Sequence, residues 1–310
     1  MKSNLFIFAL LISIMAISCG EEQKQEADLY ETETMNSGRL AVYCDDMIYP
    51  LMDTTFDMYR NMYPRVHLTD TAVSSRAAMS HLFSGEARVV VVAREYLSDE
   101  EKLMREYKVD EHQKFLLATD ALTFFTPNEY SSPDTLSAEE VYKELTNPDF
   151  KISENHPEWD SDPEFVTTDV NSSVYSNIML KAAKGDTIRK AMKIFQTLDS
   201  VRNYVSSAPG RMGILYLTHV IRDTSYKKIR MGFTVDTTGE RIYPQIVHPG
   251  YVVQGKYPYP VNYYAYLLED RRNLPFWFAS YIGKEKKVQN YYNNRGLVAG
   301  FAKYHLITED

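Results

Sequence analysis

The stretch TAVSSRAAMSHLFSGEARVVVVAREYLSDEE, Thr71–Glu101, combines a helix pattern with a strand pattern. Two serines precede a short amphipathic run over 77–84, and the glycine after that run is a common helix stop. Four consecutive valines then predict a buried strand, because an unbroken apolar run suits a parallel sheet covered on both faces. The stretch therefore predicts one helix-to-strand unit of an α/β fold. Its turns carry Arg76 and Arg88, although the chain has more acidic than basic residues.

The same alternation continues on both sides of this unit. Apolar runs at 39–44 and 65–69 predict strands, and residues 48–64 place apolar side chains on one helical face until a proline ends the pattern. Strands that alternate with helices indicate an α/β fold. The further strands are predicted at 114–127, 165–170, 211–217, 256–268 and 297–301, and the further helices at 98–109, 136–145, 173–185, 186–198, 199–210 and 274–296.

Composition narrows the class of protein. The chain has 310 residues, of which 44% are hydrophobic, enough for a large domain or two lobes. Its formal net charge of -8 argues against a nucleic-acid partner, because a phosphate backbone attracts a basic surface. We expect no nucleic-acid partner, no cofactor and a monomer.

The N-terminus has the pattern of an export signal. Residues 1–18 begin with a positive charge and continue as an apolar run too short to span a bilayer. The ending Ala-Ile-Ser-Cys resembles a bacterial lipobox, so Cys19 is predicted to be a lipid anchor in the cell envelope. An ordinary signal with a chance cysteine is the alternative. Residues 19–38 are polar and acidic, which predicts a disordered tether.

Three apolar strands are each followed by a small polar turn and a helix start. A helix start offers unpaired N–H groups, and such ends bind anions when hydroxyls add donors. If the turns meet at the carboxyl ends of their strands, they line one crevice. The alternative is three ordinary helix caps, since serine and aspartate are favoured there. The candidate ligand-binding residues are Asp45, Asp46, Met47, Ser74, Ser75, Arg76, Arg88, Asn171, Ser172 and Ser173.

Five segments, in order, resemble a periplasmic phosphate-type substrate-binding protein of the ABC transporter class. They are the turn ending IYPLM, the serine turn with AREYLSDEE, the run DALTFFTPNEYSSPDTLSAEEVYKEL, the strand VSSAPGRMGILYL, and YPYPVNYYAYLL with FASYIGKEKKVQNYYNNRGLV. The resemblance covers roughly residues 39–310. It implies a type II periplasmic-binding-protein-like fold of two α/β lobes with a hinge of crossover strands. Lobe I would hold 39–119 and 248–310, and lobe II would hold 120–247.

The resemblance also implies a function and an altered site. The family captures a small oxyanion, most often phosphate, and delivers it to an ABC permease in the membrane. Here Arg88 falls on the family's aspartate and Thr168 on its arginine, while Asp45 and Asp46 replace small uncharged residues. Two hypotheses follow. The leading one is a solute-binding lipoprotein that captures a small oxyanion, phosphate above all, for an ABC importer, with the charge of the anion site moved to lobe I. The alternative is a non-transport sensor or partner protein with a degenerate pocket.

An enzyme is the least supported class. Cys44 lacks a neighbouring histidine that would act as its base, and no histidine spacing suggests a metal site. No Ser-His-Asp pattern supports a hydrolase in the cleft. We therefore predict a binding protein without catalytic or metal-binding residues.

Overall fold

The structure is a computed structural model that describes residues 33–301. The predicted signal 1–18, the lipid anchor Cys19 and the tether up to residue 32 lie outside the described residues. Among the described residues, no helix has both the length and the apolar content that a membrane crossing requires.

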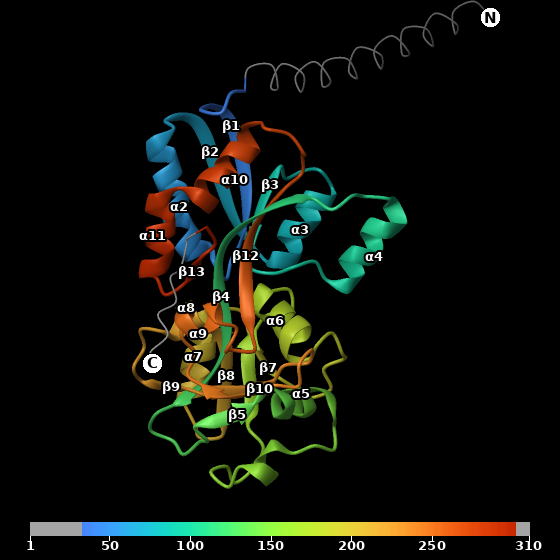
Figure 1. Cartoon of the computed structure of the whole chain (residues 1–310), viewed down its shortest axis with the longest axis vertical. Coiled ribbons are helices and arrows are strands. Elements are labelled where there is room, and N and C mark those ends of the chain that lie inside the picture. The colour runs from blue at the N-terminus through green and yellow to red at the C-terminus, as the bar shows by residue number, and fades with distance from the viewer. Residues whose placement is uncertain (1–32, 302–310) are drawn as a thin grey trace, which may run out of the picture.

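A mostly parallel sheet forms the part of the molecule that contains the first strand. β1 (Ser37–Asp45) pairs in parallel with β2 (Arg65–Val73) on one side and with β3 (Val89–Val92) on the other. All four residues of β3 are buried, as the run of valines predicts. The helices of this part lie on both faces of the sheet, and they are α2 (Tyr49–Met62), α3 (Ser75–Phe83), α4 (Ser98–Tyr107), α10 (Leu274–Lys284) and α11 (Lys286–Asn294) (Figure 1).

A second set of strands lies beyond the crossover. β8 (Arg211–Tyr216) pairs in parallel with β6 (Glu164–Thr168), which pairs in parallel with β7 (Lys193–Phe195). A separate small sheet joins β5 (Thr135–Ser137), β10 (Arg230–Thr234) and β11 (Arg241–Gln245). The remaining elements are α5 (Ala138–Thr146), a 3-10 turn (Ile152–Asn155), α6 (Ser173–Asn177), a π-helical turn (Ile178–Ala182), α7 (Leu198–Ser206), α8 (Leu217–Val220), β9 (Tyr226–Lys228), α9 (Pro249–Val253) and β13 (Val298–Ala299).

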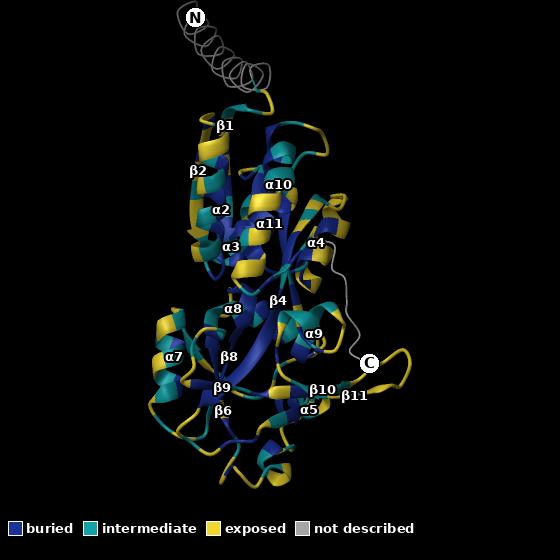
Figure 2. Cartoon of the chain, turned by 60° about the vertical axis from the view of Figure 1, so that its left-hand side comes forward, coloured by how far each residue is buried: buried dark blue, intermediate teal, exposed yellow. Residues whose placement is uncertain are grey.

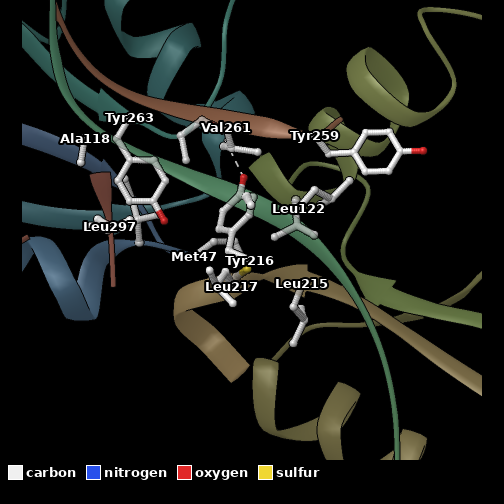
Figure 3. Close-up of a cluster of buried hydrophobic side chains, with 14 of the residues drawn as sticks. Met47, Ala118, Leu122, Leu215, Tyr216, Leu217, Tyr259, Val261, Tyr263 and Leu297 are labelled. Carbon is white, nitrogen blue, oxygen red and sulfur yellow. Dashed lines mark hydrogen bonds between the residues drawn. The ribbon is translucent and has the colours of Figure 1, made fainter. Parts of the chain in front are cut away.

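Two long strands connect the two parts. β4 (Gln113–Pro127) pairs with β12 (Pro260–Leu267) over its first half and with β8 over its second half. At this crossing, buried side chains from both parts pack together, among them Leu122, Tyr216 and Tyr263 (Figure 3). Figure 2 shows the buried strands running through both parts, with exposed faces on the outer helices. The α/β fold with two lobes is therefore confirmed, while the boundaries at 119/120 and 247/248 stay a prediction.

Some sequence predictions of local structure are wrong. No helix covers 186–198, because the N–H groups of Arg189 and Lys190 donate to the carbonyl of Leu145, and 193–195 pairs with β6 as β7. Tertiary pairing overrides the helical pattern there. The late helix 274–296 is two helices that break at Glu285, where the side chain of Gln289 donates to the freed carbonyl of Gly283.

Candidate functional site

The three polar turns meet between the lobes. The turn after β6 presents the carbonyl oxygen of Asn171 to the start of α3, where it accepts hydrogen bonds from Ser75 Oγ at 3.1 Å and from the N–H of Arg76 at 3.2 Å. The turn after β1 joins this contact region because the side chain of Asp45 faces Ser173 at the start of α6. We call this contact region the interlobe seam, and it consists of Asp45, Asp46, Met47, Ser74, Ser75, Arg76, Ala93, Asn171, Ser172, Ser173, Asn177 and Tyr216.

The carboxylate of Asp45 lies at the centre of the seam. It is fully buried, and its two oxygens accept hydrogen bonds from the N–H of Met47 at 3.1 Å and of Ala93 at 3.2 Å. Ser173 of lobe II faces the same carboxylate, at a geometry short of a full hydrogen bond. Backbone N–H groups at a strand end and a hydroxyl are the donors that hold oxyanions. The side chain of Asp45 therefore occupies donors that a bound anion would use.

Burial makes this carboxylate a weak acid. It raises the pKa of Asp45 to about 7, although Ser173 and the N–H groups of Met47 and Ala93 act in the opposite direction. Burial also raises the pKa of the half-buried Asp46, one of whose oxygens has no hydrogen-bond partner among the described residues. Charge at the seam is therefore negative or neutral, depending on pH.

The arginines near the seam are already matched to carboxylates. Arg94 is 1% exposed and forms a bidentate pair with Glu100, with both N–O distances 2.7 Å. Its Nε also donates to Ser75 Oγ at 3.1 Å, so the arginine orients the hydroxyl toward Asn171. Arg76 pairs with Asp99 at 2.6 Å. No guanidinium described at the seam is left to neutralise an incoming anion.

Arg88 is not brought to the seam. It precedes β3, at the opposite end of that strand from Ala93, and five residues of extended chain span roughly 16 Å. There it binds Glu33 and Glu269. Arg88, which the sequence comparison aligns with the family's aspartate, therefore lies at the far edge of the lobe I sheet and not at the seam.

The other predicted residues lie in or beside the seam. Ser74 and Ser172 are N-caps of α3 and α6, as the alternative of ordinary capping predicts for these two. Thr168 is buried, and its hydroxyl shares a hydrogen bond with Ser172 at 2.8 Å, so no charge replaces the family's arginine there. Met47 is 6% exposed and uses its carbonyl to accept from His219.

Sequence reasoning missed a group of side chains that close the seam. Nδ2 of Asn177 donates to the carbonyls of Ala93 at 2.6 Å and Ser173 at 2.9 Å, and the hydroxyl of Tyr216 also reaches the carbonyl of Ala93 at 3.3 Å. Arg94 is not among the candidate residues of the sequence analysis, although a basic residue that follows a buried strand and precedes Glu100 by six positions is a signal in the sequence. Asn177 has no comparable signal.

Replacement of Asn177 by alanine is expected to lower the free energy of unfolding by about 2 kcal/mol, because buried carbonyls lose their donor. Urea denaturation at pH 7 measures the change. Asn61→Ala on the exposed face of α2 is the matched control and should change stability by less than about 0.5 kcal/mol. Equal effects of the two substitutions would show that Asn177 does not hold the seam.

The arrangement defines a class of protein. Two α/β lobes, joined by crossover strands, meet at turns that follow the carboxyl ends of their strands, and this is the type II periplasmic-binding-protein fold. The family model described as "PBP superfamily domain" matches residues 30–306. The chain belongs to that superfamily.

Solved structures agree with this assignment of the fold. A putative phosphate ABC transporter substrate-binding protein from Clostridium perfringens, with bound phosphate, aligns with a TM-score of 0.66 at 13% identity, covering 84% of this chain and 99% of that one. An ABC-type phosphate transport receptor from Vibrio cholerae aligns with a TM-score of 0.66 at 14% identity, with the same coverages. PstS from Borrelia burgdorferi gives 0.55 at 16% identity, covering 86% and 99%. No curated protein sequence matches the chain.

Proposed function

We propose that this protein is a non-enzymatic, exported binding protein whose interlobe anion site is filled by its own oxygens. It acts as a sensor or partner protein on the cell envelope, held there through Cys19. One observation carries the proposal. The carboxylate of Asp45 and the carbonyl of Asn171 accept hydrogen bonds from N–H and O–H groups at the turns that would otherwise hold an oxyanion.

Electrostatics argues in the same direction. An oxyanion in the seam would lie beside Asp45 and Asp46 with no unmatched guanidinium near it among the described residues. Two unit charges 4 Å apart repel by about 4 kcal/mol at an effective dielectric constant of 20. Repulsion of that size weakens binding to the form with an ionised carboxylate by about a thousandfold.

Capture of a small oxyanion, phosphate above all, for an ABC importer is the second candidate function. The meeting of helix starts from both lobes favours it, as does the similarity in fold to proteins named for phosphate transport. It requires that Asp45 withdraws or carries a proton when the anion binds.

Calorimetry separates the two candidates. The protein is titrated at pH 7.5 with phosphate, sulfate, molybdate and tungstate. The first candidate predicts no binding tighter than about 10 mM, since repulsion offsets the hydrogen bonds. Micromolar binding of any of the four anions would contradict it and support an importer's binding protein.

A further inference from the structure

One face of the lobe I sheet is open over its first two strands. Along β1 and β2, buried side chains such as Leu40 and Leu68 alternate with side chains on the opposite face, most of which are exposed. α3 covers the neighbouring part of that face, where it packs against β3. The exposed side chains on the open part include Arg39, Ala41, Arg65, His67 and Thr69.

A groove with a volume of about 680 Å³ lies at this open face. Arg39, Ala41, His67 and Thr69 line it from the two strands, and the residues before β3 and after β12, among them Leu268, line its other side. Apolar and basic side chains therefore share its walls. The volume falls within the range of roughly 300–1,000 Å³ that is typical of binding sites for small ligands.

Three basic side chains gather on the open face. Arg39 and His67 are direct neighbours across the two strands, and Arg65 precedes His67 by two residues on the same face. The spacing of strands and residues in a sheet places the three Cβ atoms within roughly 9 Å of one another. None of the three side chains forms an ion pair or a hydrogen bond with the described residues, whereas Arg88 nearby binds two carboxylates. Because clustered like charges attract opposite charge, this surface favours an anionic partner.

The chain enters the described part of the structure at this groove. Glu33 lines the groove, and its carboxylate accepts a hydrogen bond from Arg88 at 2.9 Å. The Cγ of Glu33 lies 3.0 Å from the position that a Cβ on Gly38 would take, and Gly38 is the residue before Arg39. Two residues of chain span at most about 7 Å, so Glu31 can bring its carboxylate to Arg39.

The segment before Glu33 has the complementary composition. Residues 20–32 contain five acidic residues and one lysine, which gives a net charge of -4. Within them, the run DLYE at 28–31 places two apolar side chains between two carboxylates, which matches the apolar and basic walls of the groove. The family model matches the chain from residue 30 onward. Covalent attachment through a short linker raises the effective concentration of such a segment at its site to the millimolar range.

We propose that the acidic segment 26–32 of this chain docks into the groove, with its carboxylates on Arg39 and Arg65 and its apolar side chains against Leu268. His67 adds a further polar contact beside Arg39. This contact is separate from the seam and does not depend on the proposed function.

Docking of the segment fixes how the protein stands on its anchor. It shortens the free tether to residues 19–25, which span at most about 25 Å. β1 begins at the end of lobe I that lies farthest from lobe II (Figure 1). With Cys19 as the lipid anchor, the docked segment holds this end of lobe I near the membrane and keeps lobe II and the seam away from it.

Proteolysis of the full chain by a protease that cleaves after glutamate tests the proposal. The reaction is run at low salt in a neutral detergent, and the masses of the products measure cleavage after Glu26 and Glu31. The variant Arg39→Gln with Arg65→Gln is expected to be cleaved at these bonds at least about threefold faster than the parent, because the loss of its ion pairs releases the segment from the groove more of the time. Equal rates of cleavage would overturn the proposal.

Lys286→Gln with Lys287→Gln removes two exposed positive charges from α11 and is the matched control, which should be cleaved at the parent's rate. Both variants should keep the parent's thermal unfolding midpoint, because the replaced side chains are exposed. Sodium chloride at about 0.5 M should speed cleavage of the parent toward the rate of the arginine variant, since salt screens exposed ion pairs. If protection appears only when vesicles of phosphatidylglycerol are added, the arginines bind lipid headgroups and the docking of the segment is wrong.

Discussion

Replacement of both Asp45 and Asp46 by serine is expected to create phosphate binding, since we propose that these two carboxylates exclude the anion from the parent. The change removes the two carboxylates from the seam and leaves three donors free, namely the N–H groups of Met47 and Ala93 and the hydroxyl of Ser173. It also restores small uncharged residues at positions where the phosphate-type family has them.

The expected gain is large because the charge is buried. Relief of repulsion between two unit charges 4 Å apart is about 4 kcal/mol at an effective dielectric constant of 20. Part of that gain is offset, because the residues around the two replaced side chains must rearrange to enclose the anion, which costs free energy. At pH 7.5 part of the parent already carries a proton on Asp45, because the pKa of this group is about 7, so we expect phosphate affinity to rise at least about tenfold over that of the parent.

Calorimetry at pH 7.5 measures this gain. Asp110→Ser with Glu111→Ser removes the same two charges from an exposed loop, and it is the matched control for a change in net charge. Its phosphate affinity should equal that of the parent. If the seam variant stays folded and still binds no phosphate, Asp45 is not what excludes the anion. A gain in binding cannot come from a damaged fold.

The sequence predicted the local parts of the site well. Strand, turn and helix start at 45–47, 74–76 and 171–173 were predicted because each is encoded by neighbouring residues, such as the caps Ser74 and Ser172. Predicting the seam also required knowing how the lobes dock. Ser75 and Asn171 lie 96 positions apart, and no local pattern says that a carbonyl of one turn occupies the donors of another.

The positions of the charged side chains were harder to predict from the sequence than the course of the backbone. Arg88 and Arg94 flank the same strand, and only the direction of β3 decides that Arg94 lies at the seam while Arg88 lies at the far edge. The partners decide the rest. Asp99 neutralises Arg76, and Glu33 and Glu269 neutralise Arg88, so the two arginines that suggest an anion site in the sequence have structural roles in the fold.

The buried carboxylate of Asp45 also predicts how stability depends on pH. An unfolded aspartate titrates near 3.9, whereas burial raises the pKa of Asp45 to about 7. The folded state therefore binds the proton more tightly. The stabilisation is complete below pH 4 and is lost as pH rises through 7, and over that window it amounts to about 4 kcal/mol.

Two histidines act in the opposite direction. Burial lowers the pKa values of His219, to about 4, and of His112, so their neutral folded forms contribute stability that is present above the unfolded value near 6.5 and is lost as pH falls from there toward the folded pKa. The parent's own pH profile is therefore a sum of opposing terms. A comparison with Asp45→Asn isolates the carboxylate, because the histidines are present in both proteins.

Urea denaturation of parent and Asp45→Asn at pH 5.5 and pH 8.5 measures the difference. Between these values the parent should lose about 2 kcal/mol more stability than the variant, since roughly 1.5 pH units of the titration lie below pH 7. The amide places a donor against one N–H group, so the variant should be less stable than the parent at pH 5.5. The quantity to compare between the two proteins is the change in the free energy of unfolding between pH 5.5 and pH 8.5, and not its absolute value. Parallel pH profiles would mean that Asp45 is not an acid weakened by burial and that its carboxylate stays ionised over the whole range from pH 5.5 to pH 8.5.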